Sequence, residues 1–171
     1  MPCRGLTRAS CSASVCAIRR RPAAVSPAAL SNPAHTVPSL PTPISVTGWP
    51  RPHGYSDGVS ATGRTVVTAG VIGWNPETQQ VETDNLTSQV AQALRNIVTI
   101  LAAGGAEPAH VVRLTWYVTN RDEYIGARGA IGVAYREVMG RQFPAMAVVV
   151  VAGLLDPRAK VEIEAMAVVP A

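Results

Sequence analysis

Residues 143–165 restrict the fold of this chain more than any other stretch. They read FPAMAVVVVAGLLDPRAKVEIEA, which is two runs of strand-forming residues joined by a turn that contains a Pro. The first run is apolar at every position, a pattern typical of a strand that is buried on both faces. The second run alternates, so Glu162 and Glu164 lie on one face and apolar residues on the other. We therefore expect two sheet strands, of which the first is covered on both sides.

The remaining elements follow from periodicity and turn residues. Strands are predicted over residues 54–59 and 64–72, joined as a hairpin at 61–63, and over 111–119, 147–152 and 160–169. Two helices are predicted, the first capped by Asp84 and ended by residues 104–105, the second running from a cap at Asp122 to residue 139. The apolar stripe of the first helix contains Leu86, Val90, Ala93, Leu94, Ile97, Ile100 and Leu101.

This order of elements predicts an α+β domain in two layers, with both helices on one face of a mixed sheet. Two helices on one side leave the other side of the sheet open. Because the strand over 147–152 is apolar on both sides, a second subunit is expected to cover the open face. The pattern therefore predicts an oligomer.

Charge is distributed unevenly along the chain. Residues 1–56 contain six Arg and no acid, which gives +6, whereas residues 57–171 contain nine Lys plus Arg and eleven Asp plus Glu, which gives −2; the sum is the net charge of +4. The part from residue 57 onward thus offers no electrostatic case for nucleic acid as a partner. No apolar run reaches the roughly 20 residues of a membrane helix, so no membrane-spanning helix is expected, and no membrane is expected as a partner of the domain.

Residues 1–48 are rich in Pro, Ser, Ala and Arg and are predicted to be a disordered tail before a domain over 49–171. Three origins remain open: a targeting peptide, a basic arm around residues 19–21 for nucleic acid or anionic membranes, or a translated stretch upstream of the true start. The bias to fourteen Arg and one Lys favours the last. A cytoplasmic location is expected, or an organelle if the tail is a targeting peptide. All three cysteines lie in this tail, and their spacing predicts no metal site.

Six short motifs in the predicted domain carry a family resemblance. They occupy residues 54–56, 67–70, 74–78, 113–118, 143–145 and 161–165. Together, and in this order, they resemble the RidA/YjgF family of reactive-intermediate deaminases. The resemblance implies a chorismate-mutase-like fold and a homotrimer with a central barrel lined by the sheets and with pockets between subunits. It also implies hydrolysis of an imine or enamine to a carbonyl compound and ammonia, without a cofactor, because the imine carbon is already electrophilic.

The same resemblance assigns candidate site residues. Glu162 matches the position that orients or deprotonates a water, and Tyr55 matches a ligand-contacting position. Family members usually place a carboxylate-binding Arg where this chain has Met146. Ala69 replaces a Ser or Thr, and Val148 replaces a small polar residue or Cys. The pocket is thus expected to be more apolar than is usual and to prefer other substrates.

Several interpretations stay open at this point. Arg113 and Arg158 are candidates to replace the missing cation, although a solvated surface position is the ordinary role of such residues. Without the resemblance, the carboxylates of Glu162 and Glu164 would be assigned to a solvent-facing side or to intersubunit salt bridges. A trimer that binds a small metabolite without catalysis is the alternative to a deaminase. Ribonuclease activity, a label that some relatives carry, is disfavoured by the acidic domain.

Overall fold

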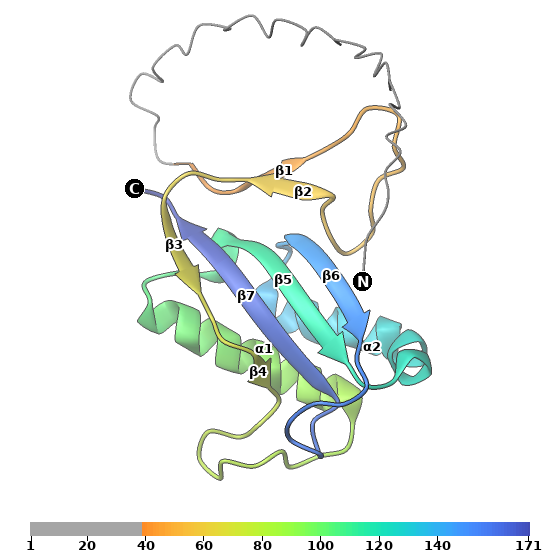
Figure 1. Cartoon of the computed structure of the whole chain (residues 1–171). Helices are drawn as coiled ribbons and strands as arrows, with labels where there is room; N and C mark the ends of the chain where they lie inside the picture. Colours follow the sequence, from red (N-terminus) through yellow and green to blue (C-terminus); the bar gives the residue numbers. More distant parts are fainter. Residues whose placement is uncertain (1–38) are drawn as a thin grey trace, which may run out of the picture. The chain divides into compact units, whose positions relative to one another are not determined.

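The structure is a computed structural model that describes residues 39–171. Both helices cover one face of a mixed, five-stranded sheet, which confirms the predicted two-layer α+β domain (Figure 1). The elements are β1 (Thr42–Ile44), β2 (Gly58–Ser60), β3 (Arg64–Val67), β4 (Val71–Ile72), α1 (Leu86–Ala103), η1 (Pro108–His110), β5 (Val111–Val118), α2 (Arg121–Met139), β6 (Ala145–Val150) and β7 (Val161–Val169). Within residues 39–171, no helix is long and apolar enough to cross a membrane.

The main sheet has the order β3-β7-β5-β6, and β4 pairs with β7 beyond the end of β3. β5 and β6 are parallel and are connected through α2, whereas β7 is antiparallel to all of its partners. Between β3 and β4, the Thr68 N–H donates to the Ala165 carbonyl at 2.9 Å, and the Thr68 hydroxyl accepts from the Ala165 N–H at 3.0 Å. The hydroxyl thereby takes the place of a ladder carbonyl where the predicted strand over 64–72 is interrupted.

The predicted hairpin between residues 54–59 and 64–72 is wrong. β2 pairs with β1 in a separate two-stranded sheet, and β3 pairs with the end of β7. Gly63, with φ +152°, lies directly against the Val169 carbonyl. A β-carbon on residue 63 would overlap that oxygen, so the turn requires glycine. β1 also lies inside the segment expected to be disordered, although the part of that segment before residue 39 lies outside the described residues.

The core lies between the helices and one face of the sheet. The stripe on α1 is buried as predicted except at Ile100, which is 43% exposed beside Leu101 at 0%. The sheet contributes Leu114, Trp116 and Ile163, which pack in the same core as the buried residues of the two helices. Alternation along β7 is also confirmed, because Ile163 is fully buried and Glu164 on the opposite face is exposed.

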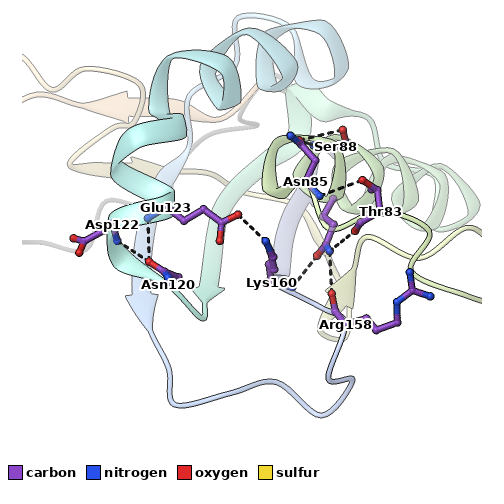
Figure 2. Close-up of polar contacts among 9 residues, drawn as sticks. Thr83, Asn85, Ser88, Asn120, Asp122, Glu123, Arg158 and Lys160 are labelled. Atoms are coloured by element: carbon purple, nitrogen blue, oxygen red, sulfur yellow. Dashed lines mark hydrogen bonds and ion pairs between the residues drawn. The ribbon is translucent and has the colours of Figure 1, made fainter.

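Both helix caps differ from the predicted residues. The cap of α1 is Asn85, whose side-chain oxygen accepts from the Ser88 N–H at 2.9 Å, and not Asp84. The cap of α2 is Asn120, which accepts from the N–H groups of Asp122 and Glu123 at 3.0 Å each (Figure 2). A capping side chain must directly precede the first helical turn. Asp122 instead lies within that turn, where its charge favours the helix dipole.

A buried glutamine fixes the start of β7 against α1. Gln89 is fully buried; its side-chain nitrogen donates to the carbonyls of Thr83 at 2.7 Å and Arg158 at 2.9 Å. Its side-chain oxygen accepts from the Lys160 N–H at 2.7 Å. The Lys160 ammonium in turn pairs with Glu123 at 2.8 Å (Figure 2). These contacts set the position from which β7 carries its carboxylates.

Candidate functional site

A cavity of about 450 Å³ lies between α2, the strands β5 and β6, and the segment before β2. Aromatic side chains form much of its wall: Tyr55, Trp116, Tyr124, Tyr135 and Phe143. Its volume falls within the range of about 300–1,000 Å³ that is usual for small-molecule sites. The cavity is therefore large enough for one small metabolite.

Tyr55 reaches the cavity because its segment is attached to the edge of β6. The next residue, Ser56, forms a parallel bridge with Ala145, and its N–H donates to the Pro144 carbonyl at 3.0 Å. The Tyr55 ring is 44% exposed, so it borders the mouth of the cavity rather than the core.

Met146 and Val148 line the same cavity. In the parallel register of β5 with β6, Met146 lies opposite Leu114 and Val148 opposite Trp116. Leu114 and Trp116 are buried against the helices, so alternate residues of β6 point to that same side of the sheet. The structure thus brings together three of the predicted site residues, Tyr55, Met146 and Val148.

The back of the cavity is rigidly packed. The rings of Tyr135 and Phe143 are stacked with centroids 5.9 Å apart, and Trp116 lies 6.5 Å from Tyr135. The Tyr135 hydroxyl donates to the Gln142 carbonyl at 2.6 Å, and burial raises the pKa of Tyr135 well above its ordinary value. The indole N–H of Trp116 is buried and finds no hydrogen-bond partner among the described residues. An unsatisfied donor of this kind is rare in a native fold.

Sequence reasoning missed two cations in this cavity, Arg128 and Arg136 of α2. Their spacing of eight residues, with Gly132 midway, places all three on one helix face, and this spacing was the signal that could have found them. The two cations proposed from sequence lie elsewhere. Arg113 lines a separate hollow on the opposite side of the sheet, and Arg158 is an exposed turn residue that lines none of the described cavities.

Glu162 and Ala69 lie apart from this cavity. Glu162 pairs in register with Tyr117, on the sheet face that the helices leave open. Its carboxylate rests on Gly70, where a β-carbon would overlap the Glu162 Oε1 atom, so Ala69 and Glu162 are neighbours. On the same face, the Tyr117 hydroxyl donates to Glu164 at 3.2 Å, and this bond raises the pKa of Tyr117. Within the described chain, the predicted site residues therefore form two groups.

Three consecutive apolar residues at the end of β6 are exposed, and the first of them, Val148, lines the cavity. The exposed fractions of Val148, Val149 and Val150 are 38%, 45% and 52%. β6 is also an edge strand of the sheet. No group of three or more His, Cys, Asp or Glu within the described part of the chain is arranged to hold a metal ion.

Comparison with known proteins agrees with this architecture. A family model described as Endoribonuclease L-PSP matches residues 50–169. The 2-iminobutanoate/2-iminopropanoate deaminase of Mus musculus is 33% identical over 127 residues, which cover 73% of this chain and 89% of that protein. The deaminase of the same description from Escherichia coli K12 is 33% identical over 114 residues, covering 67% and 86% respectively.

A solved structure shows the same fold. It is YyfB of Yersinia pestis, described as a protein of unknown function of the conserved Rid family. It is 31% identical with a TM-score of 0.68, and the match covers 77% of this chain and 100% of that one. The chain belongs to the RidA/YjgF family.

Proposed function

We propose that the protein is a hydrolytic deaminase that converts a reactive imine or enamine to a carbonyl compound and ammonia. The observation that carries the proposal is the cavity beside β6, which is lined by Tyr55, Met146 and Val148, three of the residues that the family resemblance assigns to the site. Similarity to two 2-iminobutanoate/2-iminopropanoate deaminases supports the reaction class. The replacement of the usual Arg by Met146 supports a substrate preference different from that of typical members.

We further propose that the active site is completed between subunits of a homotrimer. Glu162 and Ala69 lie on the open face of the sheet, whereas the cavity lies on the helix side, so one protomer does not bring them together. In a closed ring, the Glu162 face of one subunit would meet the cavity of its neighbour. The exposure of Val148, Val149 and Val150 supports this arrangement, because contact with a neighbour would bury them.

In the proposed mechanism, Glu162 acts as the general base. The carboxylate takes a proton from a water whose oxygen attacks the imine carbon and forms a carbinolamine. With a protonated imine as the substrate, the Glu162 carboxyl then returns its proton to the carbinolamine nitrogen, and the carbon–nitrogen bond breaks as the carboxylate takes the hydroxyl proton, which releases ammonia and leaves a carbonyl group. Tyr55 at the mouth of the cavity would hydrogen-bond to the ligand and hold the imine carbon toward the water.

A trimer that binds a small metabolite without turnover is the second candidate. It is favoured by Met146, which supplies neither charge nor hydrogen-bond donors, and by the absence of any carboxylate among the described residues that line the cavity. Ligand-induced thermal stabilisation without turnover would support this second function.

The test uses freshly generated imines, with and without a carboxylate, and follows release of the carbonyl product. The wild type is expected to accelerate hydrolysis, and Glu162→Gln is expected to lose roughly 100-fold or more of that rate, as is typical for a general base. Glu164→Gln is the matched control, since it lies two residues away on the same face of β7 and is expected to keep most of the activity. A wild type that accelerates no imine in the panel would exclude the deaminase.

A further inference from the structure

The cavity beside β6 contains a pair of cations on one face of α2. Arg128 and Arg136 each lie four residues from Gly132, so all three share the helix side that borders the cavity. Eight residues of helix separate the two Cα atoms of the arginines by about 12 Å. Gly132 leaves the floor between them without a side chain, and the Arg136 Nη1 atom lies 3.5 Å from where a β-carbon at 132 would be. The Arg136 guanidinium therefore folds back over Gly132, on the side of the helix where Arg128 lies.

Neither guanidinium is engaged by the protein itself. The two ion pairs among residues 39–171 are Arg121–Asp122 and Lys160–Glu123. Within the same residues, the side chains of Arg128 and Arg136 donate no hydrogen bond to protein groups. The charge of Arg128 acts on Tyr124, where it opposes the rise in pKa caused by burial, so Arg128 lies close to the cavity wall.

The chemistry of the wall selects an anion with an apolar body. The described residues lining the cavity include two Arg and His53 and neither Asp nor Glu. Guanidinium groups bind carboxylates through paired, charge-assisted hydrogen bonds. The half-buried Phe143, whose ring is stacked on Tyr135, adds apolar surface for the rest of the ligand.

We infer that Arg128 and Arg136 bind the carboxylate of the ligand in place of the Arg that Met146 replaces, and that the ligand is a 2-imino acid with a bulky apolar or aromatic side chain. The naming of an imino acid rests on the proposed function. Met146 then packs against the apolar part of the ligand. The carboxylate, which family members usually bind with an Arg on β6, is bound here by the two arginines of α2.

The experiment measures binding of a stable 2-oxo acid, phenylpyruvate, by isothermal titration calorimetry on the full chain, with its methyl ester as the uncharged probe. The wild type is expected to bind phenylpyruvate and to bind the ester roughly tenfold or more weakly. The double variant Arg128→Gln/Arg136→Gln is expected to lose the preference for the acid, and each single variant to lose part of it. Arg121→Gln is the matched control: it removes a cation from the same helix, outside the cavity.

The inference fails if the wild type does not bind phenylpyruvate, or if the folded double variant binds it as tightly as the wild type. If the double variant does not fold, the inference fails when both single variants bind phenylpyruvate as tightly as the wild type does. Failure of the proposed function is distinguishable. Arginine-dependent binding without turnover of any imine leaves the two arginines as the carboxylate site and removes the deaminase. If the double variant hydrolyses the phenylalanine-derived imine at the wild-type rate, the deaminase stands and the arginine site is excluded.

Discussion

Replacement of Gln89 by Met is expected to destabilise the domain substantially. The side chain is fully buried and makes three hydrogen bonds of 2.7–2.9 Å, to the carbonyls of Thr83 and Arg158 and from the Lys160 N–H. Met has a similar volume, so little is lost in packing. Three bonds at about 1 kcal/mol each, together with partner groups left unpaired, predict a loss of about 3–5 kcal/mol in the free energy of unfolding.

Urea denaturation followed by circular dichroism measures this loss directly. Gln80→Met is the control, because Gln80 is exposed in a loop and its replacement is expected to change stability by no more than about 0.5 kcal/mol. A loss below about 1 kcal/mol for Gln89→Met would refute the view that this residue anchors β7 to α1. Because Lys160 lies two residues before Glu162, deaminase activity is expected to fall together with stability.

Three further perturbations test separate contacts. Gly70→Ala is expected to displace the Glu162 carboxylate and reduce imine hydrolysis while the circular dichroism spectrum stays unchanged; full activity would contradict the contact. Asn120→Ala removes the cap of α2 and is expected to cost about 1 kcal/mol in urea denaturation, with no loss refuting the capping role. Burial raises the pKa of Tyr135 in the folded state above its value in the unfolded chain. The stabilisation that the neutral Tyr135 gives the folded state is therefore complete below about pH 10 and is lost as the pH rises further. Tyr135→Phe is expected to reduce the fall in the free energy of unfolding at alkaline pH, and an unchanged fall would contradict this.

Those features that depend on periodicity could be predicted from sequence. The stripe on α1 and the alternation of β7 each report a buried face, and burial in the structure follows them. Trp116 and Tyr117 lie on opposite sides of β5 as adjacent strand residues must, with Trp116 in the helix-facing core. Local patterns of this kind need no knowledge of distant contacts.

Other features depend on contacts between distant segments. The expected hairpin failed because the end of β7 occupies the edge of β3, a pairing between residues about a hundred positions apart that no turn signal encodes. Arg158 was proposed as a cation near the site, but the turn that carries it is fixed by Gln89 at the start of β7. Arg128 and Arg136 share a helix face that their spacing predicts, but the cavity bordered by this face is formed by β6 and the segment before β2, which the spacing does not encode.

The shared active site is tested most directly by complementation between two variants. Glu162→Gln removes the proposed base, and Val148→Trp fills the cavity; each alone is expected to be nearly inactive as a trimer. We assume that the base and the cavity of one site come from different subunits and that equal amounts of the two variants are refolded together. Half of the sites then receive an intact Glu162 from one subunit, and half receive an open cavity from the neighbouring subunit. About a quarter of the sites therefore have both the base and the cavity. An active site shared between subunits therefore predicts recovery of about a quarter of wild-type imine hydrolysis in the mixed trimers. Mixed trimers without any recovery would contradict it.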